Sequence, residues 1–224
     1  MYNKVLTGIL VVLLIAIIGA LSYLGFNYYK QYKGDKDAGE YLEKEFDNIV
    51  VPINEQEEEE EPQPEENQEN TNTGEGVSAD SNANQSATHT GYYKGFKVIG
   101  KLEMPTISKQ FPILDESPNA NAIEVSILKI YGPTLNTVGN VVIAGHNYNN
   151  GTFFSRNKNL QIGDKLYVTD MTGKRVEYTI YNKYYTPESD NSYINRTTDG
   201  KVEITLYTCD ATGDNRLIIC ARAE

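Results

Sequence analysis

The chain reads Val202-Glu-Ile-Thr-Leu-Tyr-Thr-Cys209, then a short polar turn, then Arg216-Leu-Ile-Ile-Cys-Ala-Arg222 near its C-terminus. Both runs are rich in β-branched residues, which is typical of short strands. A cysteine therefore ends one predicted strand, and an arginine begins the next. A thiol attacks as its thiolate, which a neighbouring cation or base favours. The pair predicts a cysteine nucleophile beside a cation.

A histidine upstream provides the base that such a nucleophile needs. His146 follows a β-branched run and opens the polar loop 147–151, so its ring is expected at a strand end facing a cleft. A purely structural histidine is the alternative, and the presence of Cys209 and Arg216 argues against it. We expect no metal, because one histidine and two strand cysteines do not supply the converging ligands of a zinc site.

The same residues resemble a known family. Thr205-Leu-Tyr-Thr-Cys209 matches the Thr-Leu-x-Thr-Cys signature of sortases, the transpeptidases that anchor proteins to the cell wall of Gram-positive bacteria. Arg216 falls seven residues past the cysteine, where that family places its arginine. Gly139-Asn-Val-Val-Ile-Ala-Gly-His146 looks like the sortase strand that delivers the histidine.

Two further regions resemble sortase segments. Phe153-Phe-Ser155 with Leu160-Gln-Ile-Gly-Asp-Lys-Leu-Tyr-Val168 is similar to the segment after the histidine, and Gly100-Lys-Leu-Glu-Met-Pro-Thr-Ile107 with Phe111-Pro-Ile-Leu114 is similar to the opening strands. The resemblance keeps a consistent order over residues 95 to 223 and implies an all-β, closed β-barrel. It does not assign a sortase class.

An apolar run without charge extends from residue 5 to about residue 26. About 20 such residues cross a bilayer as a helix, so we expect a tail over 1–4 and a transmembrane signal-anchor over 5–26. A cleaved signal peptide is the weaker alternative. The run is longer than a usual signal core, and Ala20-Leu-Ser22 is only a loose cleavage site.

The charges that flank this span favour a different orientation from the one that the resemblance implies. Lys4 precedes the span, whereas Lys30, Lys33 and Lys36 follow it, and that count would place the C-terminal part inside the cell. A very short N-terminal tail is the usual form of a signal-anchor, and the sortase resemblance implies an extracellular catalytic domain. We therefore expect a single-pass membrane protein with its catalytic domain outside.

Between the span and the strand-rich part, residues 55–91 are rich first in Glu and then in Asn, Ser, Thr and Gly. Such a segment cannot bury enough apolar surface to offset its ordering entropy, so we expect a disordered tether in which His89 is solvated. Much of the net charge of −11 lies there and does not describe a binding face. An interaction with cationic wall components is the weaker alternative. Residues 27–54 form a juxtamembrane segment, with a short amphipathic helix expected over 38–49.

Residues 92–224 are expected to form the catalytic domain, with short strands bounded by Gly, Asn, Asp and Pro. We expect a hairpin turn at Asp170-Met-Thr-Gly173 and one helical turn over 152–159. No nucleotide-binding glycine loop occurs, and we expect neither a cofactor nor a nucleic-acid partner. A fragment beginning near Thr90 should be soluble, monomeric and active if the span and tether contribute no core.

The two cysteines of the chain raise the alternative of a disulfide, which is common in secreted proteins. If the last two strands form an antiparallel hairpin, Arg216 lies opposite Cys209, and Cys220 lies opposite about Thr205. That separation is four residues at about 3.3 Å each, which is beyond bridging distance. Cys220 is then a buried free thiol, the ordinary state of an unpaired cysteine.

The resemblance implies a reaction: acyl transfer of the hydrolase type. Cys209 would attack the threonine carbonyl of a Leu-Pro-x-Thr-Gly-like sorting signal, His146 would protonate the leaving amine, and Arg216 would bind the oxyanion. An amine of the cell wall or of a pilin would then accept the acyl group. The same resemblance implies that Thr208, Pro187 and Ile194 bind the substrate. Glu188 and Asp190 would be the ligands if the chain used calcium as some sortases do.

Two other classes remain as alternatives. A papain-like hydrolase is disfavoured, because there the cysteine precedes the histidine and begins a helix. A membrane-tethered, non-catalytic β-domain that binds cell-wall components is the non-enzymatic alternative, and labelling with a thiol-reactive substrate mimic would separate it from an enzyme. The chain lacks an obvious lid and a C-terminal hydrophobic segment, which favours anchoring over pilus assembly.

Overall fold

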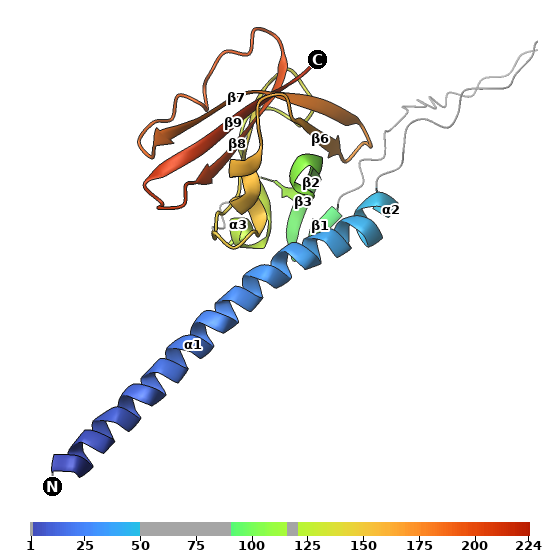
Figure 1. Cartoon of the computed structure of the whole chain (residues 1–224). Coiled ribbons are helices and arrows are strands. Elements are labelled where there is room, and N and C mark those ends of the chain that lie inside the picture. Colours follow the sequence, from blue (N-terminus) through green and yellow to red (C-terminus); the bar gives the residue numbers. More distant parts are fainter. Residues whose placement is uncertain (1, 50–90, 116–120) are drawn as a thin grey trace, which may run out of the picture.

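The computed structural model describes residues 2–49, 91–115 and 121–224 (Figure 1). The predicted tether and His89 lie outside these ranges, apart from Gly91. The helices are α1 (Tyr2–Tyr41), the π-helix η1 (Leu42–Phe46), α2 (Asp47–Ile49), the 3₁₀ helices η2 (Pro105–Ile107) and η3 (Phe153–Asn159), and α3 (Ala122–Val125). The strands are β1 (Gly91–Tyr93), β2 (Phe96–Met104), β3 (Lys109–Leu114), β4 (Ile127–Tyr131), β5 (Gly139–Ala144), β6 (Lys165–Asp170), β7 (Arg175–Pro187), β8 (Val202–Cys209) and β9 (Asn215–Ala223).

The strands form one sheet that closes on itself. Its order is β1-β2-β3-β4-β5-β8-β9-β7-β6, and a further pairing of β2 with β6 completes the ring. The pairs β3–β4 and β5–β8 are parallel, and the other pairs are antiparallel. The predicted all-β, closed barrel with short helical turns is confirmed. The predicted turn at 170–173 joins β6 to β7, and the predicted helical turn over 152–159 is η3.

The barrel core follows the side-chain alternation expected of strands. In β2, Val98, Leu102 and Met104 are buried while their neighbours are more exposed. Strands β5, β8 and β9 have nearly continuous burial instead, because a second apolar cluster covers their outer face. This cluster contains Val142 and Tyr193, so the connection between β7 and β8 covers these strands from outside. Strands covered on both faces read as continuous apolar runs.

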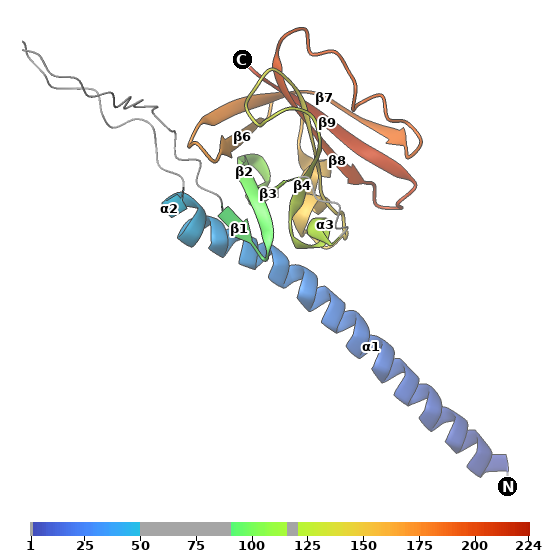
Figure 2. The ribbon, with the colours of Figure 1, turned by 180° about the vertical axis from the view of Figure 1, so that it is seen from behind.

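Helix α1 begins with the predicted span. An 18-residue window of this helix has a mean hydropathy of 2.8, and none of it is buried by the residues that the structure describes, so the helix is long and apolar enough to cross a membrane. The helix does not end where the apolar run ends. It continues without a break into η1 and α2, and its C-terminal part lies along the barrel (Figures 1 and 2).

The C-terminal part of this helix contributes to the barrel core. Its buried apolar residues belong to the same cluster as the barrel interior, and they are Ala38, Tyr41, Leu42 and Phe46. The ring centroids of Tyr41 and Tyr93 are 5.0 Å apart, which ties the helix to β1. The amphipathic helix expected over 38–49 is thus the end of one continuous helix. A fragment beginning near Thr90 would lack these helical side chains, which belong to the core.

Charged pairs also join the helix to the barrel. Asp37 pairs with Lys94 at 2.7 Å, and Asp35 pairs with Lys109. The Oδ1 atom of Asp35 also accepts a hydrogen bond of 2.8 Å from the backbone N–H of Phe153, the first residue of η3. The Lys94–Asp37 pair is partly exposed, and exposed ion pairs contribute about 0–1 kcal/mol, whereas the side chains of the Lys109–Asp35 pair are only 17% and 13% exposed.

Candidate active site

The parallel pair β5–β8 brings the ends of two strands to one edge of the barrel. Ala144 is the register partner of Tyr207, and the N–H of Gly145 donates a 3.1 Å hydrogen bond to the carbonyl of Tyr207. Parallel strands keep aligned residues side by side, so continuing this register by two residues brings His146 alongside Cys209. The histidine and the cysteine of the sequence prediction therefore lie at the same edge.

Two side chains lock the ends of these strands together. The Oγ1 atom of Thr208, a residue 2% exposed, donates a 2.6 Å hydrogen bond to the carbonyl of Gly145. The Nδ2 atom of Asn147 donates a 2.9 Å hydrogen bond to the carbonyl of Cys209. Thr208 thus fixes the backbone that carries His146. Its predicted contact with substrate stays a prediction.

Arg216 lies directly opposite Cys209 in the antiparallel pair β8–β9. The residue is 7% exposed, and its Nε atom donates to the hydroxyl of Tyr207 at 2.8 Å. Its Nη2 atom lies 2.5 Å from Oε1 of Glu188. Burial alone would lower the pKa of Arg216. The hydrogen bond to Tyr207 and the negative charges that Cys209 and Glu188 carry when ionised raise it instead.

Both cysteines are free thiols. Cys209 is partly exposed, whereas Cys220 is 2% exposed and lies opposite Thr205, as the hairpin geometry predicted. Burial raises the pKa of the Cys220 thiol. Raising the pKa makes the thiolate scarcer, so Cys220 is suited to packing and Cys209 to reaction.

His146 has a partner that the sequence did not indicate. Glu124, from α3, places its Oε1 atom 2.9 Å from Nε2 of His146, and its Oε2 atom accepts a 2.7 Å hydrogen bond from the hydroxyl of Tyr148. The Tyr148 ring lies over the His146 ring with centroids 5.0 Å apart. Burial and the bond to Glu124 raise the pKa of Tyr148, so its hydroxyl keeps its proton and donates. Glu124 is a single acidic residue between Ile123 and Val125, and no local signal marks it.

Pro187 and Ile194, predicted to bind substrate, occupy different places. Pro187 is exposed at the end of β7 and pairs with Asn215, next to Arg216. Ile194 packs on the outer cluster that covers β5 and β9, and it also lines a cavity of about 460 Å³. Pro187 is therefore near Arg216, and Ile194 is farther along the sheet.

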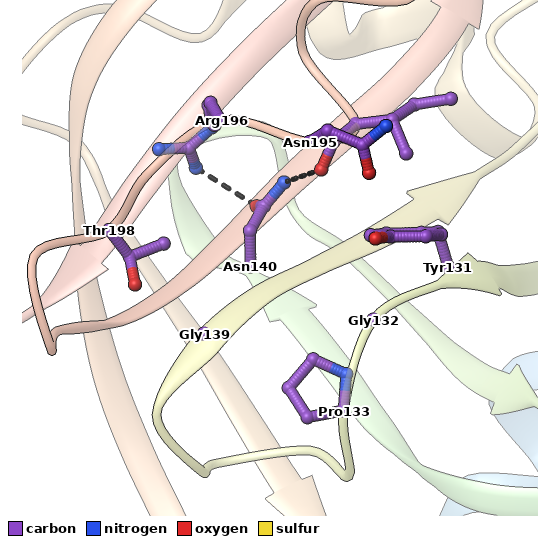
Figure 3. Close-up of a pocket in the computed structure, with 9 residues that line it drawn as sticks. Tyr131, Gly132, Pro133, Gly139, Asn140, Asn195, Arg196 and Thr198 are labelled. Atoms are coloured by element: carbon purple, nitrogen blue, oxygen red, sulfur yellow. Dashed lines mark hydrogen bonds between the residues drawn. The ribbon is translucent and has the colours of Figure 1, made fainter.

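Figure 3 shows this cavity at the start of β5. The Nδ2 atom of Asn140 donates to the carbonyls of Tyr193 and Ile194 at 3.0 and 3.2 Å, and its Oδ1 atom accepts a 2.9 Å bond from Arg196. Asn140 precedes His146 by six residues, which is about 20 Å along an extended strand. The cavity lies under the connection between β7 and β8, well away from Cys209.

A buried charge cluster fastens that connection. The Glu203 side chain is 0% exposed and pairs with both Arg196 and Arg222, the latter at 2.6 Å. Burial alone would raise the pKa of Glu203, but hydrogen bonds from the two arginines and Tyr181 lower it. Sequence reasoning assigned Arg222 no role and missed Arg196 and Glu203, because their pairing joins residues from separate segments.

The two acidic residues considered as calcium ligands are engaged elsewhere. Glu188 pairs with Arg216, and Asp190 accepts hydrogen bonds from the hydroxyl of Thr186 and from the N–H of Ser192. In the parts of the chain that the structure describes, no group of three or more His, Cys, Asp or Glu residues is placed to hold a metal ion.

A closed barrel with a cysteine, a histidine and an arginine on neighbouring strand ends defines the architecture of sortases. A family model described as the sortase domain matches residues 102–224. The chain therefore belongs to the sortase family.

Individual relatives agree with this assignment. Sortase A of Bacillus anthracis is 31% identical over 121 residues, which is 53% of this chain and 55% of that protein. The match thus spans about half the length of the curated relative. Sortase A from Corynebacterium diphtheriae is 27% identical, covers 58% of this chain and 61% of that chain, and has a TM-score of 0.51.

A sortase D5 transpeptidase from Clostridium perfringens is also 27% identical, covers 57% of this chain and 79% of that chain, and has a TM-score of 0.52. Sortase A of Listeria monocytogenes, at 23% identity over 57% of this chain and 87% of that chain with a TM-score of 0.51, shares the fold. The names of these solved structures give different sortase classes, so the similarity does not assign a class to this chain.

Proposed function

We propose that the chain is a cysteine transpeptidase that cleaves a Leu-Pro-x-Thr-Gly-like sorting signal and transfers the acyl part to an amine. The observation that carries this proposal is the row of side chains at one barrel edge. Cys209 is a free, partly exposed thiol with Arg216 directly opposite and His146 next along the sheet. The similarity to a solved sortase transpeptidase supports the same reaction.

In the first half-reaction, the Cys209 thiolate attacks the threonine carbonyl of the sorting signal. Negative charge gathers on the carbonyl oxygen, and the Arg216 guanidinium donates to it. His146 as imidazolium protonates the leaving glycine amine. The carbon–nitrogen bond breaks, and the acyl group remains on Cys209 as a thioester.

In the second half-reaction, an amine attacks this thioester and His146 accepts a proton from it. The carbon–sulfur bond breaks, the new amide leaves, and the thiolate and imidazolium are restored. This chemistry needs no cofactor. An amine of a peptidoglycan precursor or of a pilin is the proposed acceptor, and surface proteins with a C-terminal sorting signal are the proposed donors.

The sorting signal is proposed to lie along the connection between β7 and β8. Pro187 is exposed beside the strand pair that carries Arg216, which suits a contact close to the scissile bond. Ile194 is proposed to contact the more distant, apolar part of the signal, and Thr208 its backbone. Helix α1 is proposed to anchor the protein in the cell membrane, with the barrel on the extracellular side.

Mass spectrometry of the intact full-length chain in detergent tests this proposal. A panel of Leu-Pro-x-Thr-Gly-type peptides should leave an acyl adduct on the wild-type chain and none on Cys209→Ala. Cys220→Ser should retain most of the adduct, because its buried thiol has no part in the reaction. A folded wild-type chain without any adduct would instead support the alternative of a non-catalytic, wall-binding β-domain.

A further inference from the structure

A cavity of about 430 Å³ is lined by residues of α1 and of the barrel, among them two residues of α3. Asn27 and Gly34 line it from the helix, and Glu124, Tyr148 and Phe153 line it from the barrel. Asn27 directly follows the predicted membrane span. The cavity therefore joins the membrane-proximal end of the molecule to the loop that begins at His146.

The barrel wall of this cavity touches the proposed catalytic base. Nε2 of His146 is buried and has no aligned hydrogen-bond partner among the described residues, yet Oε1 of Glu124 lies only 2.9 Å away. The Glu124 side chain is 57% exposed, so its carboxylate is open to solvent. Tyr148 donates to the other oxygen of Glu124 and lies against the His146 ring.

The chemistry of this wall suits a primary amine. An aliphatic amine is an ammonium ion at neutral pH, and it must lose protons beside the base before it attacks. A carboxylate accepts about four hydrogen bonds, so Glu124 can receive an ammonium while it holds Tyr148. Lys94 also lines the cavity, but its charge is engaged by Asp37 at 2.7 Å. The rings of Tyr148 and Phe153 add faces that attract cations.

The sheet order separates this cavity from the proposed path of the sorting signal. Cys209 ends β8, which lies between β5 and β9. Glu124 belongs to α3, which directly precedes β4 on the β5 side, whereas Pro187 and Arg216 belong to β7 and β9 on the other side. Two substrates can therefore approach the same sulfur from opposite sides.

We propose that the cavity between α1 and the barrel binds the amine acceptor, with Glu124 holding its ammonium group beside His146. This inference rests on the proposed transpeptidation. The ammonium gives one proton to solvent at the open carboxylate, and the resulting amine attacks the Cys209 thioester. The carbon–nitrogen bond forms, the second proton passes to His146, and the carbon–sulfur bond breaks with the thiolate as leaving group.

The partition of the thioester between an amine and water tests this site. The full-length chain in detergent is supplied with a sorting peptide and with one of two probes, triglycine, which carries an ammonium, or hydroxylamine, which is neutral at neutral pH. Aminolysis and hydrolysis products arise from the same thioester, so their ratio does not depend on how fast it forms.

Glu124→Gln should lower the triglycine ratio by about 10-fold or more, because a hydrogen bond to a charged group is worth about 1.5–3 kcal/mol. The ratio with hydroxylamine should change by less than about twofold, since this probe brings no charge for the carboxylate to hold. Glu177→Gln is the matched control, because it makes the same change of side chain away from the cavity. Glu177 lies on β7 and pairs with Lys165 on β6.

Asn27→Trp is a second, independent variant, since it fills the cavity from the helix and leaves Glu124 in place. It should also lower the triglycine ratio. An unchanged triglycine ratio in both variants would overturn the acceptor site. An equal fall for triglycine and hydroxylamine in Glu124→Gln would overturn it too, because Glu124 would then act only on His146. A wild-type chain that forms no thioester would refute the proposed function itself.

Discussion

At the scale of single residues, Arg216 decides how the proposed oxyanion is stabilised. Its side chain is nearly buried, and its position opposite Cys209 aims a planar, permanently charged group at the reacting edge. Lysine keeps the charge but lacks the fork of donors. Arg216→Lys should therefore lower kcat by about 10²-fold or more, the usual loss when an oxyanion donor is removed.

Steady-state kinetics on a sorting peptide checks this prediction. The loss should fall on kcat, with a smaller change in KM. Near-normal kcat with a raised KM would mean that Arg216 only docks the substrate and that the oxyanion role is wrong.

Glu188 is predicted to compete with the proposed substrate for the same guanidinium. Its carboxylate lies 2.5 Å from Nη2 of Arg216, although its side chain is 72% exposed. A substrate oxygen that binds Arg216 must displace this contact. Exposed ion pairs are worth about 0–1 kcal/mol, so Glu188→Gln should raise kcat/KM by up to about fivefold.

The test of this competition is a comparison of kcat/KM for Glu188→Gln with that for Asp190→Asn, a change in the same connection that does not touch Arg216. A lower kcat/KM for Glu188→Gln would show that the carboxylate supports Arg216 and does not block it.

At the scale of elements, the turn between β8 and β9 holds Cys209 and Arg216 in register. Oδ2 of Asp210 accepts a 3.0 Å bond from Asn215, and Oδ1 accepts from Thr212 and from the N–H of Gly213. The bond from Asn215, followed by those from Thr212 and Gly213, lowers the pKa of Asp210 to about 2. The ionised carboxylate thus stabilises the turn.

The pKa of Asp210 falls below its ordinary value of 3.8 on folding, so its contribution is present above about pH 4 and is lost as the pH falls towards 2. The difference in unfolding free energy between the wild type and Asp210→Asn should be constant near neutral pH and shrink between about pH 4 and 2. Urea unfolding at a series of pH values measures it. Parallel curves for Asp210→Asn and the wild type would contradict the prediction.

The sequence predicted the strands whose residues carry a pattern within a short stretch of chain. The strand ends at Cys209 and Arg216 follow from β-branched runs around a short polar turn, and their register predicted that Cys220 lies opposite Thr205. Glu124 was not predictable, because its contact with His146 joins residues more than twenty positions apart and depends on how α3 packs against the barrel. Side-chain contacts that form only when the barrel closes produce no periodic pattern in the sequence.

At the scale of the whole molecule, the continuity of α1 was also missed. Lys30, Lys33 and Lys36 mark the end of an apolar run, and the acidic segment that follows suggested a tether between two independent parts. The helix instead continues to residue 49 and places an acidic and apolar face against the barrel. Gly34 and Asp35, which contact Phe153 of the barrel, lie about 12 Å beyond the end of the apolar run, at 1.5 Å per residue. The active-site edge is thus held at a short distance from the span.

This arrangement predicts that the minimal stable fragment begins before the docked helix. A fragment of residues 91–224 leaves the barrel face under Leu42 and Phe46 open to water, whereas a fragment of residues 27–224 keeps it covered. Burying one such side chain is worth about 1.5–3 kcal/mol, which is a large share of the 5–15 kcal/mol that stabilises a typical domain. We expect a clearly lower urea midpoint for the shorter fragment.

Activity should fall with stability in the shorter fragment, because Asp35 no longer holds the backbone of Phe153. That residue has a φ of 43°, in the left-handed region, and its ring lies 5.9 Å from Tyr148, which in turn packs on His146. Phe46→Ala in the longer fragment separates the two effects: it should lower the midpoint by weakening the docking while Asp35 is still present. Equal midpoints and equal peptide cleavage for the two fragments would mean that the docked helix supports neither the core nor the histidine loop.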